Sequence, residues 1–178
     1  MKRAVFLDRD GVLNETFVRS GIPYPAANAE AVRILPGVPQ ALKSLKQFGF
    51  LLIVVTNQPD VARGTQTLAA VEAINARLAA QLPLDEFRVC PHDDADDCPC
   101  RKPKPGLLLA AAAAHGIDLK SSYMIGDRAG DVLAGTAAGC QTFLIARPYS
   151  KSETCRPDFT VAGLSEAAAI IARQLESR

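Results

Sequence analysis

The chain has 178 residues, of which 48% are hydrophobic and 22% charged, and its formal net charge is +1. These values are typical of one globular domain over residues 1–178, and the low net charge gives no electrostatic case for a nucleic-acid partner. No apolar run is long enough to span a membrane, and the first one ends at Asp8, which is too early for a signal peptide, so we expect a cytoplasmic protein without a membrane partner.

Short apolar runs alternate with helical patterns along the chain. Strands are predicted at residues 5–7, 51–55, 87–89, 123–125, 142–145 and 159–161. Helices are predicted at residues 38–48, 68–78, 106–115, 131–138 and 163–175. This alternation predicts an α/β fold, a three-layer Rossmann-like sandwich with a mostly parallel sheet. Residues 15–35 have no clear period and are predicted to form a long loop over the ligand crevice.

Two carboxylates, Asp8 and Asp10, directly follow the first predicted strand. Open α/β sheets keep their ligand crevice at the carboxyl ends of the strands, so both side chains are expected there. Two carboxylates about 4 Å apart repel by roughly 4 kcal/mol at an effective dielectric of about 20. Such a pair needs a cation, a shared proton or a wide separation. The alternative is a polar loop whose acids only solvate the end of a strand.

Polar residues also follow the second and fourth predicted strands. Thr56, Asn57 and Gln58 could donate hydrogen bonds to an anion, although such residues are also common in turns. Asp127 and Asp131 follow the fourth strand, and carboxylates that converge without a histidine suit a hard cation such as Mg²⁺. Asp131 could instead be a first-turn residue that the helix dipole favours.

Residues 90–100 hold four of the seven Cys and His residues of the chain. In a cytoplasmic protein, cysteines are expected as metal ligands or free thiols rather than disulfides. The four are Cys90, His92, Cys98 and Cys100. Three thiolates and one imidazole form a closed tetrahedral set, which predicts a structural Zn²⁺ rather than a catalytic one with an open position. The alternative is four unrelated side chains.

Arg101 and Lys102 follow this loop directly and would bring two cations to the edge of the crevice. An arginine can bind a phosphate or a carboxylate through two hydrogen bonds, whereas a lysine acts as a point charge. An anionic substrate is therefore expected.

Four segments together resemble the motifs of the haloacid dehalogenase superfamily of phosphohydrolases. They are Phe6-Leu7-Asp8-Arg9-Asp10-Gly11-Val12-Leu13-Asn14, Thr56-Asn57-Gln58, Arg101-Lys102-Pro103 and Gly126-Asp127-Arg128-Ala129-Gly130-Asp131. The cysteine-rich loop resembles the branch that acts on heptose 1,7-bisphosphate and histidinol phosphate, and Asn14 and residues 62–64 are more similar to the heptose enzymes. The sequence departs from those enzymes at Pro59-Asp60 and over residues 15–29.

The resemblance implies a Mg²⁺-dependent phosphatase, and the stretches between its motifs are too short for a cap domain. It implies Asp8 as the nucleophile, which forms an aspartyl-phosphate, and Asp10 as the acid and base. Thr56 and Lys102 would bind the phosphoryl oxygens, with Lys102 held by Asp127 or Asp131 when no ligand is bound. Mg²⁺ would be held by Asp8, the backbone carbonyl of Asp10, and Asp127.

The substrate implied by the resemblance is a small phosphorylated sugar, and we expect the enzyme to be a monomer. Asn57, Gln58, Arg101 and Arg128 would contact this substrate. Arg101 is the candidate for a second phosphate of a bisphosphate. A histidinol-phosphate phosphatase, a phosphotransferase and a metal-stabilised binding module remain alternatives at this point.

Overall fold

The computed structural model describes residues 1–150 and 154–177, and its centre is a six-stranded parallel sheet with the order β5-β4-β1-β6-β7-β8. The strands are β1 (Ala4–Leu7), β4 (Leu51–Asn57), β5 (Glu86–Cys90), β6 (Tyr123–Gly126), β7 (Gln141–Ile145) and β8 (Phe159–Val161). All six predicted strands are confirmed, and the mostly parallel sheet is confirmed with them.

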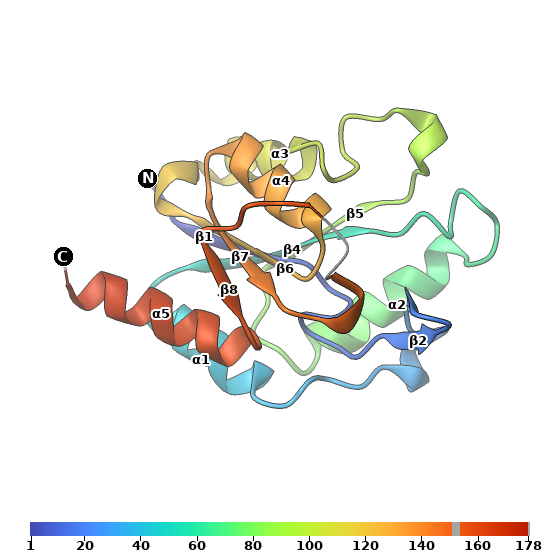
Figure 1. Ribbon diagram of the computed structural model, residues 1–178, viewed down its shortest axis with the longest axis horizontal. Helices are drawn as coiled ribbons and strands as arrows, with labels where there is room; N and C mark the ends of the chain where they lie inside the picture. The colour runs from blue at the N-terminus through green and yellow to red at the C-terminus, as the bar shows by residue number, and fades with distance from the viewer. Residues whose placement is uncertain (151–153, 178) are drawn as a thin grey trace.

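Helices cover both faces of the sheet and complete three layers (Figure 1). One face carries α1 (Val38–Gln47), α2 (Leu68–Ala79) and α5 (Leu164–Glu176), and the other carries α3 (Gly106–His115) and α4 (Ala129–Ala138). Val5 and Leu7 belong to the first of these cores, whereas Ala4 and Phe6 belong to the second. Burial on both sides explains why β1 is a continuous apolar run. The five predicted helices are confirmed, and α4 begins two residues before the predicted start at Asp131.

The prediction of a loop over residues 15–35 is wrong in one respect, because this segment contains an antiparallel hairpin. Strands β2 (Phe17–Arg19) and β3 (Ile22–Tyr24) pair across Ser20-Gly21, and a short 3-10 turn, η1 (Ala29–Ala31), follows. Ser20 and Gly21 have φ values of 50° and 80°, the left-handed geometry of a tight two-residue hairpin turn. The hairpin could not be predicted from the sequence because both of its strands are mostly exposed. Such strands lack the alternation of apolar and polar residues that indicates a half-buried strand.

The strand order places the predicted functional segments side by side. β1 lies between β4 and β6, and Leu7 pairs with both Val54 and Ile125. Because these strands are parallel, the residues that follow them emerge at one edge of the sheet. At this edge the described residues add the hairpin segment, the loops after β4 and β5, and the segment after β7, which fits the expected core without a cap domain. Within the described ranges, no helix is both long and apolar enough to cross a membrane.

Candidate active site

A pocket of about 540 Å³ opens at the carboxyl edge of the sheet. Its size lies within the range of small-molecule sites. Its lining includes every residue predicted to act on or bind the substrate: Asp8, Asp10, Thr56, Asn57, Gln58, Arg101, Lys102, Asp127 and Arg128. Thr16 and residues 22–25 line it as well, so the segment over residues 15–35 lies over the crevice as predicted.

Lys102 is the buried cation at the base of this pocket, with 3% of its side chain exposed. Its Nζ donates to Asp8 Oδ1 at 2.8 Å, to Asp131 Oδ1 at 2.5 Å and to the carbonyl oxygen of Val55 at 2.7 Å. Burial lowers the pKa of Lys102, but the carboxylates of Asp131 and Asp8 outweigh it and raise that pKa above its usual value. The ammonium group therefore stays charged and uses all three of its protons. Of the two predicted partners, it is Asp131 that holds the lysine, together with Asp8.

Asn57 fixes the backbone of the same lysine. Its Nδ2 donates to the carbonyl oxygen of Lys102 at 2.9 Å, and its Oδ1 accepts from the backbone N–H of Lys102 at 3.1 Å. The end of β4 thus holds the segment after the cysteine-rich loop at the pocket.

The carboxylate of Asp10 receives hydrogen bonds from three side chains. Arg9 donates to Oδ2 at 2.8 Å, Gln58 donates to Oδ2 at 2.9 Å, and Asn14 donates to Oδ1 at 2.9 Å. Arg9 is fully buried, and its Nη1 also donates to Asn75 Oδ1 on α2 at 3.0 Å. Sequence reasoning did not predict a role for Arg9 or Asn75. The available signal was a polar residue, Asn75, beside the apolar stripe of α2.

Three carboxylates meet where a cation was predicted. Asp8, Asp127 and Asp131 each place one oxygen within 4.8 Å of the others. Among the described residues, Oδ1 of Asp127 is buried without a hydrogen-bond partner, and a hard cation would satisfy such an oxygen. Burial, reinforced by the charges of Asp8 and Asp131, raises the pKa of Asp127 well above its usual value. The residues present therefore fit a bound Mg²⁺.

Asp8 is a second buried carboxylate whose pKa is raised. Burial raises its pKa to about 6, with Lys102 opposing the shift and Asp131 adding to it. A divalent cation in contact with this carboxylate would stabilise its ionised form.

Asp131 has both oxygens occupied by other groups. Oδ1 accepts from Lys102, and Oδ2 accepts from the backbone N–H groups of Asp127 at 3.2 Å and Arg128 at 3.0 Å. The first-turn role considered for Asp131 is therefore observed, because its carboxylate binds donors at the N-terminus of α4.

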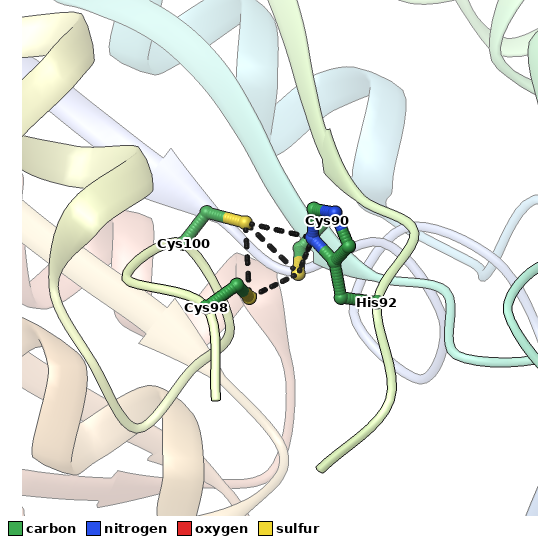
Figure 2. A group of neighbouring side chains, drawn as sticks. All are labelled: Cys90, His92, Cys98 and Cys100. Carbon is green, nitrogen blue, oxygen red and sulfur yellow. Dashed lines mark hydrogen bonds between the residues drawn. The ribbon is translucent and has the colours of Figure 1, made fainter. Parts of the chain in front are cut away.

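The four predicted zinc ligands face one another in the loop after β5 (Figure 2). Sγ of Cys98 lies 3.6 Å from Sγ of Cys90 and 3.3 Å from Sγ of Cys100, and Nδ1 of His92 lies 3.3 Å from Sγ of Cys100. Around a tetrahedral zinc with Zn–S bonds of about 2.3 Å, sulfurs lie about 3.8 Å apart. The observed sulfur separations of 3.1–3.6 Å are somewhat shorter, so the four donors could bind one Zn²⁺ after a small outward shift.

The acidic residues of this loop, which reads Asp93-Asp94-Ala95-Asp96-Asp97, hold it against neighbouring cations. Asp93 accepts two hydrogen bonds of 2.7 Å from Arg63, and Asp97 binds Lys104. The hydrogen bonds from Arg63 lower the pKa of Asp93 to about 2. Arg63 also lines the pocket, so the loop is tied to the pocket wall.

Two further arginines line the pocket. Arg101 donates to Asp94 Oδ1 at 2.6 Å, and the side chain of Asp94 is 81% exposed. Such an exposed ion pair contributes little energy, so Arg101 can exchange Asp94 for a substrate anion. The guanidinium of Arg128 lies 5.9 Å from the centre of the Tyr149 ring.

The parallel sheet, the carboxylates after β1 and β6, and the buried lysine are the features of the haloacid dehalogenase class of hydrolases. A family model described as HAD-hydrolase-like matches residues 99–167. The D-glycero-beta-D-manno-heptose-1,7-bisphosphate 7-phosphatase of Pasteurella multocida is 38% identical over an alignment of 158 residues, which covers 83% of each chain. The enzyme of the same name from Escherichia coli K12 is 35% identical and aligns with 96% of this chain and 94% of its own.

A solved structure agrees with these sequence relatives. The D,D-heptose 1,7-bisphosphate phosphatase of B. bronchiseptica, complexed with magnesium and phosphate, superposes with a TM-score of 0.84 at 29% identity. The match covers 98% of this chain and 99% of that one. The chain therefore belongs to the family of HAD-like hydrolases that contains these heptose-bisphosphate phosphatases.

Proposed function

We propose that the chain is a Mg²⁺-dependent phosphatase that removes the 7-phosphate of a heptose 1,7-bisphosphate, and that residues 1–178 act as one catalytic domain. The observation that carries this proposal is the meeting of Asp8, Asp10, Asp127 and Lys102 in one pocket. The names of the relatives supply the substrate.

Asp8 is the nucleophile in this proposal. One of its carboxylate oxygens attacks the phosphorus, the bond between phosphorus and the sugar oxygen breaks, and an aspartyl-phosphate forms. Lys102 holds Oδ1 of Asp8 at 2.8 Å, which fixes the orientation of the carboxylate toward the pocket. Phosphate-monoester hydrolysis is among the slowest uncatalysed reactions, with accelerations up to about 10²¹, so a covalent step joined to charge neutralisation is a suitable solution.

Asp10 transfers the protons. In its acid form it gives a proton to the departing sugar oxygen, and as a carboxylate it then takes a proton from the water that attacks the aspartyl-phosphate. That second attack releases inorganic phosphate and restores Asp8. The hydrogen bonds from Arg9, Asn14 and Gln58 hold the carboxylate of Asp10 near the carboxyl end of β1 between the two steps.

Positive charge in the pocket offsets the repulsion between the phosphate and these acids. We assign Asp8, Asp127 and the backbone carbonyl of Asp10 as Mg²⁺ ligands, because both oxygens of Asp131 already accept hydrogen bonds. When bound, Mg²⁺ supplies electrostatic stabilisation of phosphoryl oxygens. Thr56 and Lys102 would bind the remaining oxygens of the transferring group.

The second phosphate of the substrate would lie near the outer cations of the pocket. Arg101 and Arg128 both line it, and Arg101 donates to the exposed carboxylate of Asp94 and, at 3.4 Å, to the carbonyl oxygen of His92. Asn57 and Gln58 line the same pocket. The proposed structural Zn²⁺ at Cys90, His92, Cys98 and Cys100 fixes the loop from which Arg101 and Lys102 follow.

The substrate assignment is tested by measuring phosphate release with Mg²⁺ from three compounds: a heptose 1,7-bisphosphate, the heptose 7-phosphate and histidinol phosphate. A charged hydrogen-bond pair to the second phosphate contributes about 1.5–3 kcal/mol, so kcat/KM should favour the bisphosphate over the monophosphate by about 10- to 100-fold. A higher kcat/KM for histidinol phosphate would contradict the substrate. Transfer to an added alcohol in preference to water would indicate a phosphotransferase.

Replacing Lys102 with Met should lower kcat by about 10²- to 10³-fold, because a buried cation that stabilises developing charge is lost. Lys104→Met is the matched control, since Lys104 follows two residues later, is 45% exposed and binds Asp97 away from the acids. Its kcat should stay within about twofold of the wild type. Both variants are compared by phosphate release and by circular dichroism in Mg²⁺. Comparable kcat values for the two variants would remove Lys102 from the mechanism.

A further inference from the structure

The segment that follows β7 makes contacts with Asp127 that no sequence motif indicates. It contains a short 3-10 turn, η4 (Pro148–Ser150). The hydroxyl of Tyr149 donates to Asp127 Oδ2 at 2.5 Å, and Oγ of Ser150 donates to the backbone carbonyl of Asp127 at 2.5 Å. The side chain and the backbone of one predicted metal ligand are thus held by two consecutive residues.

The same segment is also bonded to the loop after β1. Arg147 donates to the carbonyl oxygen of Gly11 through Nη2 at 2.7 Å and Nε at 3.2 Å. Gly11 has a φ of 83°, and a Cβ at this position would overlap Asp127 Oδ2 and the hydroxyl of Tyr149. A glycine is therefore required for Tyr149 to reach Asp127.

We propose that Tyr149 is a positioning residue that fixes the carboxylate of Asp127 for the cation. Its hydroxyl occupies Oδ2, whereas Oδ1 is buried, has no hydrogen-bond partner among the described residues, and belongs to a carboxylate that meets those of Asp8 and Asp131. With Oδ2 held, rotation of the carboxylate away from this arrangement breaks a hydrogen bond. Groups that orient metal ligands in this way typically change metal affinity by about 10- to 100-fold when they are removed.

Tyr149 also contacts Thr16, a residue next to the hairpin. The Oγ1 of Thr16, next to β2, lies 3.4 Å from the Tyr149 hydroxyl. Since the proton of Tyr149 is directed to Asp127, the tyrosine oxygen can accept a hydrogen bond from Thr16. Tyr149 therefore connects the base of the hairpin over the pocket to a predicted metal ligand.

This inference rests on the proposed Mg²⁺-dependent phosphatase, so its test separates metal binding from turnover. Tyr149→Phe keeps the ring and removes only the hydroxyl. Tyr123→Phe is the matched control, because its hydroxyl donates to Gln174 at 3.2 Å in the first core, away from the pocket. The Mg²⁺ dissociation constant is measured for each protein from the rise of Tm with Mg²⁺ concentration, and kcat is measured at saturating Mg²⁺.

The expected result is a Mg²⁺ dissociation constant about 10-fold higher for Tyr149→Phe, with kcat at saturating Mg²⁺ within a few-fold of the wild type and no change for Tyr123→Phe. An equal dissociation constant for Tyr149→Phe and wild type would overturn the inference, and so would an equal weakening in both variants. In those cases a wild type that binds Mg²⁺ and hydrolyses the bisphosphate leaves the proposed function standing. A wild type that needs no Mg²⁺ for hydrolysis would contradict both the Mg²⁺ dependence of the proposed function and the proposed role of Tyr149.

Discussion

Replacing Asp8 with Asn should lower kcat for phosphate release by about 10⁴-fold or more, because an amide oxygen cannot serve as the nucleophile that accepts the phosphoryl group. Acid-quenched wild-type protein should carry a phosphoryl group during turnover, whereas the variant should carry none. Phosphate release and the mass of the quenched protein give the two measurements.

The Asp8→Asn variant should remain folded, which separates its loss of activity from a loss of structure. The asparagine still offers an oxygen to Nζ of Lys102 in place of Asp8 Oδ1. Because burial raises the pKa of Asp8 to about 6, above its value in the unfolded chain, keeping this carboxylate ionised at pH 7.5 costs folding free energy in the metal-free protein. The neutral side chain removes this cost, so the Tm measured without Mg²⁺ should be equal to that of the wild type or higher.

A matched control lies before β5, at the opposite edge of the sheet. Asp85 pairs with Lys46 and accepts from the backbone N–H of Leu52. Asp85→Asn should leave kcat within about twofold of the wild type, whatever it does to Tm. If Asp8→Asn retained more than about 1% of the wild-type kcat, the covalent step would have to be abandoned.

The central part of the fold could be predicted from sequence because buried parallel strands leave a strong signal. The runs that became β1, β4 and β6 are apolar on both faces, and the polar residues that follow them emerge at one edge. The hairpin was missed because Phe17, Val18, Ile22 and Tyr24 are large apolar residues that are exposed. These side chains face solvent or the pocket, so their order in the sequence does not show the alternation of a strand with one buried face.

The residues that support the site were harder to predict than those that form it. Lys102 was predicted, but its partner could not be chosen between Asp127 and Asp131, since the choice depends on side-chain directions at the start of α4. Asn57 was predicted to contact substrate, yet here its amide holds the backbone of Lys102. Tyr149 lies in the segment after β7, and only the folded structure brings it to Asp127.

Replacing Cys98 with Ser should release the proposed zinc and destabilise the protein. A thiolate is the ligand that zinc prefers, and a serine hydroxyl does not ionise at neutral pH to replace it. With its zinc lost, the acidic part of the loop is held mainly by surface ion pairs such as Arg63–Asp93, which contribute little energy. We expect the free energy of unfolding to fall by about 3 kcal/mol or more, which corresponds to a fall in Tm of roughly 6–12 °C.

The same substitution should lower activity, although none of the four proposed zinc ligands lines the pocket. Arg101 and Lys102 follow Cys100 directly, and the ammonium of Lys102 must reach Asp8 to within hydrogen-bond distance. A displacement of about 1 Å can cost about 10²-fold in rate, so kcat should fall by about that factor. Cys155→Ser is the control, because Cys155 lies outside the four-residue cluster. Zinc content by mass spectrometry, Tm and kcat should separate the two variants. A wild-type protein that is fully active without stoichiometric zinc would show that Cys90, His92, Cys98 and Cys100 hold the loop without a metal, and that Arg101 and Lys102 are positioned by their other contacts.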